Sequence, residues 1–555
     1  MRRRDFLRLT AGAAITVGTM FPEFQPLRAD TEGAQPGTPQ SSDRNSFPAE
    51  DARNTKRLVQ SFPRASQLAA LTDWYTAMDS TGGKTVDLFR DNISYLMANN
   101  AIWGGIGLHK FSYGGLHNVK NSFVKDWNSN SQYMRWNIHS DDTSSYHIDA
   151  LIGQQKGVAV RIQVGGDTLE KVLLSDSLDR VALGQITIPQ GDSTLTISVP
   201  TGAFEMTLFS LELYPTTAEA AIKSRIARTR SRATWMSHTP MGMMYQWGQW
   251  GGNAKGQGSP WPNCYANFDY AGFAQRLQNE GADFLVWSIT YSEYYVAAPI
   301  AAIDVILKGR TCKTDYLNTL LTECQKRGIE VIFYYHAGHD PNPNPDWWDA
   351  FWTAPLTANG VYARKESPIN KVIDIFAEIG ERYGNKLSGW MLDDGGVYYP
   401  APFERLSNAL KAGNPDRIIS FNSAYMFHFA PRMTDFEDFY FGETPKGSSL
   451  IGWPTDAEGV YTEGPFIGEH AFANFQTESG NWGYFNDVSG ARIGMRPDHS
   501  LNTTMSAETF KAIATHAEET HAMAAYDFRM YEDGMQSPAS LERFKAAAAA
   551  THASK

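Results

Sequence analysis

The sequence predicts an α/β protein in which an antiparallel β-sandwich precedes a (β/α)8 barrel of the TIM type. From about residue 233 onward, short apolar segments alternate with amphipathic segments of helical periodicity, which is typical of parallel strands joined by helices. Before residue 215, short β-branched or alternating segments end at Gly, Pro or Asp, as in antiparallel sandwiches. The 555 residues are enough for both domains.

The first 29 residues have the features of a twin-arginine signal peptide. Arg3 and Arg4 precede a mildly apolar run rich in Ala, Gly and Thr, and Leu27-Arg28-Ala29 provides a cleavage site. An uncleaved basic tail is the alternative. No later segment has the 18 or more consecutive apolar residues of a membrane span. We therefore expect a periplasmic or secreted protein with no membrane span in its mature form.

The sandwich is predicted over residues 71–215, after a linker at 30–70 that is polar and rich in Pro, Gly and Ser. It either binds carbohydrate or only supports the barrel. Residues 216–232 have helical periodicity and a basic face, and we expect a connector helix there. The strands predicted in the sandwich are SSYHIDALIG (144–153), GVAVRIQVGG (157–166), GQITIP (184–189), STLTISVP (193–200) and FEMTLFSLELY (204–214).

The barrel is predicted over residues 233–545. Its predicted strands are 242–247, 282–290, 329–336, 386–394 and 417–423, and its predicted helices are 270–281, 315–328, 369–384 and 403–414. A doubly wound sheet is the alternative. No Gly-x-Gly-x-x-Gly or Walker loop opens any of these helices, so nucleotide binding has no support in the sequence.

Composition narrows the class of function. A net charge of −11 argues against a nucleic-acid partner, because no basic surface would offset the phosphates. The three cysteines have no zinc-site spacing, and any disulfide would be optional. The 15 Trp, 25 Tyr and 30 Phe suit a core, but such an aromatic content also suits a sugar-binding cleft. We expect an oligosaccharide or polysaccharide substrate and predict no cofactor.

Candidate site residues are the polar side chains that follow the predicted barrel strands, because active sites of such barrels lie at the carboxyl ends of the strands. They are Gln246, Trp247, Thr290, Tyr291, Glu293, Tyr335, His336, His339, Asp340, Asp393, Asp394, Asn422, Tyr425, Glu443 and Glu469. Two adjacent carboxylates after the apolar run at 390–392, followed by two glycines, are the strongest of these signals.

The chemistry that these residue types favour is glycoside hydrolysis. There is no Gly-x-Ser-x-Gly elbow, and no cysteine lies in a reactive context. Carboxylates among aromatic residues remain, and glycosidases need one carboxylate as nucleophile or base and one carboxylic acid as proton donor. A metal-dependent hydrolase using His336 and His339 is a further alternative, although no clear additional ligand is present and we predict no metal.

The order of motifs in the barrel region, over roughly 235–545, resembles the α-L-fucosidases of glycoside hydrolase family 29. The segments that carry the resemblance are MGMMYQWG (241–248), FDYAGFAQRLQNEGADF (268–284), TDYLNTLLTECQKRGIEVIFYYH (314–336), GWMLDDGG (389–396), FGETPKG (441–447), NWGY (481–484) and MYEDGMQSP (530–538). The resemblance implies a barrel, two-carboxylate chemistry and a retaining double displacement.

The departures from the family concern the sugar more than the reaction. The family's His before Trp-Gly is Gln246 here, and its Lys-His-His stretch that holds fucose falls on 290–295, which has no Lys or His. Replaced hydrogen-bonding groups change which sugar fits. A glycosidase for another sugar, such as an arabinofuranoside or a galactoside, is therefore an alternative, as is a carbohydrate-binding protein without activity.

The resemblance also implies roles for the carboxylates. Alignment on Gly-Trp-x-x-Asp places the nucleophile at Asp393, which we prefer, whereas alignment on Asp-Gly places it at Asp394. For the acid/base we prefer Glu469, then Glu443 and Glu478, since the family's glutamate precedes its Trp-Gly-Tyr. The substrate-binding residues expected beside them are Gln246, Trp247, Tyr291, Glu293, Tyr335, His336, Asn422 and Trp482.

Overall fold

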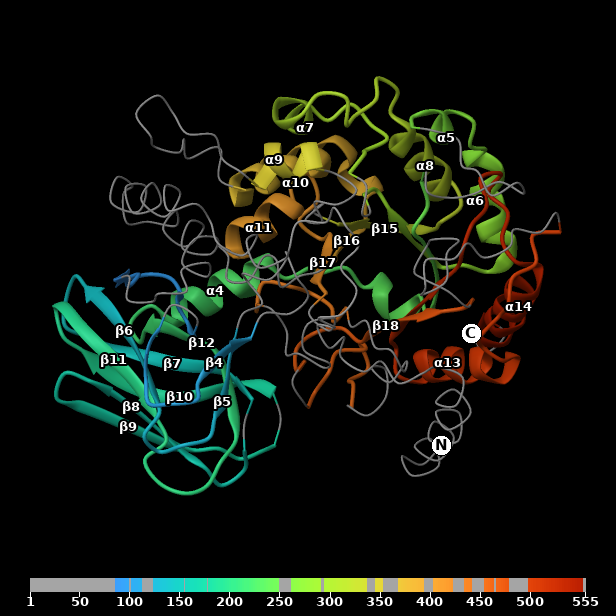
Figure 1. Ribbon diagram of the computed structural model, residues 1–555. Helices are drawn as coiled ribbons and strands as arrows, with labels where there is room; N and C mark the ends of the chain where they lie inside the picture. The colour runs from blue at the N-terminus through green and yellow to red at the C-terminus, as the bar shows by residue number, and fades with distance from the viewer. Residues whose placement is uncertain are drawn as a thin grey trace, which may run out of the picture.

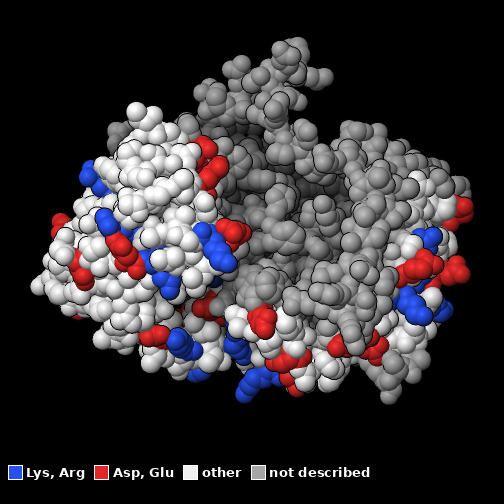
Figure 2. Space-filling model, turned by 90° about the horizontal axis from the view of Figure 1, so that it is seen from below, with Lys and Arg blue, Asp and Glu red and all other residues white. Residues whose placement is uncertain are grey.

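The computed structural model describes residues 85–98, 101–111, 123–153, 155–176, 178–248, 261–290, 294–336, 345–352, 368–393, 403–422, 434–441, 454–463, 466–478 and 498–552. Within these ranges the chain forms a mixed α/β structure with two mainly antiparallel sheets and one parallel sheet (Figure 1). The predicted signal peptide and linker lie outside the described residues. On the face seen in Figure 2, acidic and basic side chains are interspersed over the described surface.

The two N-terminal sheets contain the strands predicted in this part of the chain. The first has the order β1 (Val86–Asp87), β6 (Tyr133–Ser140), β11 (Gly191–Ser198), β8 (Ala159–Val164) and β9 (Asp167–Val172), with β3 (Ile102–Gly104) on β6. The second has the order β10 (Leu178–Ile188), β7 (Ser144–Gly153), β12 (Met206–Pro215), β5 (Phe123–Trp127) and β4 (His109–Phe111), with β2 (Ser94–Met97) on β12. Every pairing is antiparallel except that of β1 with β6.

These two sheets share one apolar core. Trp136 and Ile197 of the first sheet and Ile148 and Leu211 of the second are fully buried in the same cluster. The strands alternate buried and more exposed residues, because successive side chains of a strand point to opposite faces of its sheet. One face of each sheet therefore contributes side chains to this shared cluster.

The connector is helix α4 (Glu219–Thr229), inside the range predicted for it. It packs on α11 (Phe403–Leu410), a helix of the parallel part, and Arg225 Nε donates a 2.9 Å hydrogen bond to Glu404 there. The Lys411 ammonium donates to the carbonyl oxygen of Thr229 at the end of α4. The connector is therefore tied to the second half of the chain (Figure 1).

The second half contains a parallel half-barrel of seven strands, consistent with a TIM-like domain. The strand order is β17 (Ile418–Phe421), β16 (Gly389–Leu392), β15 (Glu330–Tyr335), β14 (Phe284–Ser288), β13 (Met241–Tyr245), β19 (Met523–Asp527) and β18 (Phe472–Gln476). The helices around it are α5 (Asn263–Ala266), α6 (Tyr270–Glu280), α7 (Ala301–Ile306), α8 (Tyr316–Gln325), α9 (Pro345–Trp352), α10 (Pro368–Tyr383), α11, α13 (Ala507–Glu519) and α14 (Pro538–His552), with short 3-10 turns η3 (Trp235–His238) and η5 (Gly384–Lys386). All five strands and four helices predicted here are present.

Local sequence explains where the helices begin and end. Asp269 and Asp315 cap α6 and α8, since their carboxylates accept hydrogen bonds from the backbone of Gly272 and Asn318. Gly281 ends α6 with a φ of 84°, a left-handed conformation that favours glycine. Each capped helix is followed within a few residues by an apolar strand, which gives the repeated strand–helix order of the domain.

The parallel sheet has two different faces. Its outer face packs against the helices in the largest apolar cluster, which includes Trp287 and Trp390. Its inner face carries a smaller cluster that contains Met244, Ile332 and Met391 and receives no side chain from the described α-helices. Along each strand, residues of the outer-face cluster alternate with residues of the inner-face cluster, so the face on which a strand residue lies follows from the faces of its neighbours.

Backbone hydrogen bonds also connect the two outer strands of this sheet. Asp438 N donates to the carbonyl oxygen of Ile419 in β17 (2.8 Å), and His470 N, just before β18, donates to Asp438 O (3.0 Å). Tyr440 N donates back to His470 O (3.0 Å). Residues 438–440 thus link β17 to the chain entering β18.

Candidate active site

Asp393 directly follows β16, and its carboxylate is held from two neighbouring strands. The Tyr334 hydroxyl on β15 donates to Oδ2, and Asn422 Nδ2, just after β17, donates to Oδ1 at 2.7 Å. Its backbone N donates to Tyr335 O at 2.9 Å. The side chain is half-buried. A carboxylate with each oxygen fixed and some access to solvent is suited to act on a ligand.

The partners of Asp393 reach it because of strand register. Tyr335 lies beside Leu392, and Leu392 beside Phe421, so Asp393 and Asn422 continue neighbouring strands side by side. Tyr334 belongs to the inner-face cluster, and Asn422 is fully buried. Buried polar groups require hydrogen-bond partners, and here the carboxylate is one of them.

His336 and Gln246 lie at the same end of the sheet. His336 follows β15 on the face of Tyr334, and Gln246 follows β13 on the face of Met244; both are buried. The Thr290 hydroxyl donates to His336 O at 2.7 Å and accepts from His336 N at 2.8 Å, which fixes the chain beyond β15 to the chain beyond β14. Five of the predicted site residues are therefore gathered at the carboxyl ends of the strands: Gln246, Thr290, His336, Asp393 and Asn422.

Tyr335 and Trp247 were predicted to bind substrate, but the structure places both in the outer-face core. The Tyr335 hydroxyl is 2.9 Å from that of Tyr294, its ring packs edge-on against Phe376, and burial raises its pKa. Trp247 Nε1 donates to Tyr531 O at 3.1 Å within the same core. Alternation along their strands turns both side chains toward the helices, away from Asp393.

Glu469, the preferred acid/base of the sequence analysis, lies at the amino ends of the strands, whereas Asp393 lies at their carboxyl ends. It lies before the first residue of β18, whereas Asp393 lies after the last residue of β16, and the strands are parallel. Glu469 is fully buried. The pKa of Tyr461 is raised first by the burial of Tyr461 and then by the negative charge of Glu469. This placement does not bring the two carboxylates to one site.

The remaining predicted site residues lie outside the described part of the chain. They are Tyr291, Glu293, His339, Asp340, Asp394, Tyr425, Glu443 and Trp482.

Two residues that the sequence analysis did not select lie at the same end as Asp393. Tyr334 is one, and Asp527, the last residue of β19, is the other. Asp527 is 4% exposed, and its pKa is raised well above the ordinary value by burial, with Arg529 opposing and Glu478 adding to the shift. Its signal in the sequence is that of Asp393, a carboxylate that ends an apolar run.

Glu478 is also buried at this end, and burial raises its pKa. Its Oε2 accepts hydrogen bonds from the Thr477 hydroxyl (2.7 Å) and from Arg529 N (3.1 Å), and Ser540 near the start of α14 also bonds to it. These contacts join β18, β19 and α14, so Glu478 has a structural role.

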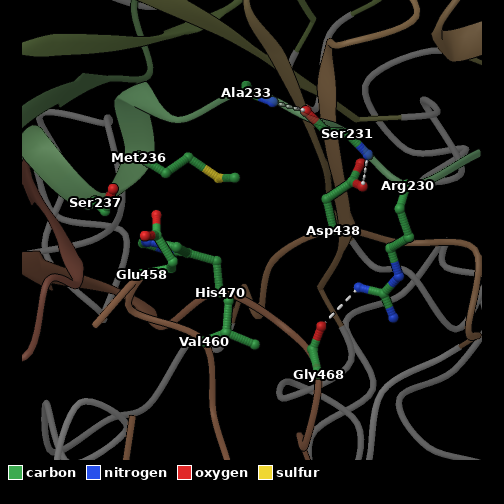
Figure 3. Close-up of a pocket in the computed structure, with 10 residues that line it drawn as sticks. All are labelled: Arg230, Ser231, Ala233, Met236, Ser237, Asp438, Glu458, Val460, Gly468 and His470. Carbon is green, nitrogen blue, oxygen red and sulfur yellow. Dashed lines mark hydrogen bonds between the residues drawn. The ribbon is translucent and has the colours of Figure 1, made fainter. Parts of the chain in front are cut away.

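The other features of the described chain lie away from Asp393. No group of three His, Cys, Asp or Glu side chains in the described ranges could hold a metal ion. A cavity of about 140 Å³ opens near the amino ends of the strands, between η3, Asp438 and His470 (Figure 3). Asp438 accepts from Ser231 N there at 2.7 Å, which anchors the end of the connector.

None of the helices that the structure describes is long and apolar enough to cross a membrane.

Comparisons with known proteins find likeness in structure alone. The chain matches no protein-family model and no curated protein. It is similar to a Bacteroides thetaiotaomicron α-L-fucosidase of family GH29 (16% identity, 58% of this chain and 74% of the other, TM-score 0.40). It is also similar to the Lactobacillus casei α-L-fucosidase AlfC with bound α-L-fucose (14% identity, 60% and 99%, TM-score 0.35). Likeness at this level does not assign a substrate, a reaction or a residue of this chain.

Proposed function

We propose that the protein is an exported glycoside hydrolase of the α-L-fucosidase kind, which hydrolyses an α-linked sugar with retained configuration. L-Fucose or a related sugar is the substrate, and Asp393 is the nucleophile. In the first step a carboxylate oxygen of Asp393 attacks the anomeric carbon while a second carboxyl group protonates the departing oxygen. Water then releases the sugar from Asp393.

The observation that carries the proposal is the setting of Asp393. Tyr334 and Asn422 hold its two oxygens, so its direction is fixed before a substrate arrives, which favours attack in a defined geometry. The same carboxylate ends the segment Gly389–Leu392 that resembles the nucleophile strand of family 29.

The architecture proposed with this function is a closed (β/α)8 barrel over residues 233–545. The hydrogen bonds of residues 438–440 support closure, because they span the gap between β17 and the start of β18. The N-terminal sheets at 71–215 form a sandwich that supports the barrel or binds carbohydrate, and α4 connects the two. Export by the twin-arginine route is proposed from Arg3 and Arg4 alone.

A screen of aryl α- and β-glycosides tests the function, with L-fucoside, D-galactoside and arabinofuranosides in the panel. Wild-type protein should hydrolyse at least one α-glycoside, and Asp393→Asn should lose that activity while its thermal unfolding stays close to wild type. Near-normal kinetics in Asp393→Asn would remove Asp393 from the reaction. Sugar binding without turnover on any glycoside would instead favour a carbohydrate-binding protein.

A further inference from the structure

Asp527 is a buried acid on the inner face of the parallel sheet. Met523 and Ala525 of the same strand belong to the inner-face cluster, and alternation gives Asp527 the same orientation. In the register of the sheet it lies between Met244 of β13 and Gln476 of β18. Its position as the last residue of β19 puts it at the carboxyl end of the sheet, the end at which Asp393 follows β16.

One carboxyl oxygen of Asp527 has no hydrogen-bond partner within the described residues. This oxygen, Oδ1, is buried and accepts no hydrogen bond from any group in the part of the chain that the structure describes. Neighbouring Glu478 also has a buried oxygen without a partner in that part of the chain, Oε1, but its Oε2 accepts hydrogen bonds from the Thr477 hydroxyl and from Arg529 N. A buried carboxyl oxygen without a donor is costly to a fold, and buried carboxyl groups with a shifted pKa concentrate at functional sites.

The protonation state of Asp527 suits a donor of protons. Burial, with Glu478 nearby, holds its pKa well above the ordinary range despite Arg529. The shift favours the protonated form of the group, which is the form that the acid of a glycosidase needs before the first step.

Strand order places Asp527 across the sheet from Asp393. Between β16 and β19 lie β15, β14 and β13 in one direction. In the other direction lie β17, the linking residues 438–440 and β18. Equal steps on both sides put β16 and β19 on opposing walls once the sheet is closed. Their inner-face side chains then flank a common space above the apolar cluster.

We propose that Asp527 is the general acid/base that works opposite the nucleophile Asp393, an inference that rests on the function proposed above. In the first step the Asp527 proton passes to the glycosidic oxygen as the bond from that oxygen to the anomeric carbon breaks and a bond from Asp393 forms. In the second step the Asp527 carboxylate takes a proton from water, the water oxygen bonds to the anomeric carbon, and the bond to Asp393 breaks. Both residues return to their starting states.

The test compares leaving groups in Asp527→Asn, using the sugar that wild type hydrolyses in the glycoside screen. On the methyl glycoside, whose leaving group needs a proton, kcat/KM should fall by about 10²- to 10⁴-fold. On the 2,4-dinitrophenyl glycoside, whose leaving group needs none, kcat/KM should fall less than about tenfold. Added azide should speed turnover of the variant and yield a glycosyl azide, because a small anion replaces the activated water.

Glu478→Gln is the matched control, since it neutralises the other buried acid at this end of the sheet. The inference is overturned if the dependence on the leaving group appears in Glu478→Gln and not in Asp527→Asn, or if Asp527→Asn loses both substrates equally. Should Asp527→Asn not fold, Asp527→Ser repeats the test, and unfolding of both variants would show a structural residue. A wild type inactive on every glycoside overturns the proposed function, and this inference with it. An active wild type with an unaffected Asp527→Asn overturns the inference alone.

Discussion

Asn422 Nδ2 donates a 2.7 Å hydrogen bond to Asp393 Oδ1 from the neighbouring strand of the parallel sheet. Asn422 is fully buried, whereas Asp393 is half-buried, so the amide is shielded from solvent and the carboxylate residue keeps some access to it. The donor therefore sets the direction of the acceptor. The first two predictions concern this arrangement.

Asn422→Ala should lower kcat by about ten- to a hundredfold, because a hydrogen bond to a charged group contributes about 1.5–3 kcal/mol. Loss of the donor lets the Asp393 carboxylate rotate away from the direction of attack. Steady-state kinetics on the best aryl glycoside measures the effect. Asn279→Ala, on the exposed side of α6, is the control and should keep wild-type kinetics. Equal kcat in the two variants would mean that Asn422 does not orient the carboxylate.

Tyr334→Phe should also lower kcat by about ten- to a hundredfold, because its hydroxyl is the donor to the other oxygen of Asp393. The ring remains, so the inner-face cluster keeps its packing. Tyr526→Phe is the matched control: that hydroxyl is also buried but donates to Phe510 O on the outer face, 3.2 Å away. A similar loss of stability in both variants, with loss of kcat in Tyr334→Phe alone, is the expected result. Unchanged kcat in Tyr334→Phe would contradict the role.

The sequence was sufficient to predict the strands and helices whose apolar periodicity is strong. The segment predicted as a strand at 144–153 is β7 residue for residue, and the four predicted barrel helices match α6, α8, α10 and α11 within a few residues. These elements are decided locally, by periods of about two and 3.6 residues. Strand β19 was not predicted, since MAAYD contains two alanines, which are uncommon in strands. Asp527 was missed together with its strand.

The parts of the site that could not be predicted depend on faces and on register. Asp393 follows from the end of an apolar strand, but Tyr335, which was predicted to bind substrate, lies on the outer face, whereas Tyr334 contacts Asp393. Counting two residues back from His336 would have selected Tyr334. Glu469 was favoured by its distance in sequence from Trp482, yet it comes before β18 begins. Which end of a strand a residue occupies is decided by pairing with distant segments, which a single sequence does not contain.

Asp149→Asn should make the protein more stable at neutral pH. Asp149 is half-buried on β7 near Glu212, Arg180, Asp435 and His147, and desolvation followed by the charge of Glu212 raises its pKa from 3.8 to about 6. The folded state then binds more protons than the unfolded state between these values, so the free energy of unfolding falls as pH rises through that window. The ionised group costs about 3 kcal/mol above pH 6.

Urea unfolding at pH 4 and pH 7.5 measures this effect. Asp149→Asn should gain about 1–3 kcal/mol over wild type at pH 7.5 and little at pH 4. Asp167 gives a contrast of opposite sign, because hydrogen bonds from the backbone of Thr187 and then Thr168 lower the pKa of this exposed carboxylate. Asp167→Asn should therefore lose stability at pH 7.5. A gain in both variants would point to a general effect of net charge.

Arg417→Lys should destabilise the fold strongly. The Arg417 side chain is fully buried and donates to five carbonyl oxygens, those of Gly380, Gly384, Leu387, Leu410 and Ala412. These oxygens lie at or near the ends of α10, η5 and α11, so one guanidinium joins three elements that support β16.

A lysine ammonium has three donors and no planar fork, so it leaves buried carbonyls without partners. Each unsatisfied group costs about 1–3 kcal/mol, and Arg417→Lys should lower the free energy of unfolding by about 3 kcal/mol or more. Arg232→Lys is the control, since Arg232 is 81% exposed and pairs with Asp416 at the surface; its change should stay within about 0.5 kcal/mol. Chemical unfolding of both variants measures the difference. Arg417 supports the strand that Asp393 follows, so Arg417→Lys should also lower activity in the fraction that remains folded. A normal kcat in Arg417→Lys would show that β16 keeps its position without Arg417.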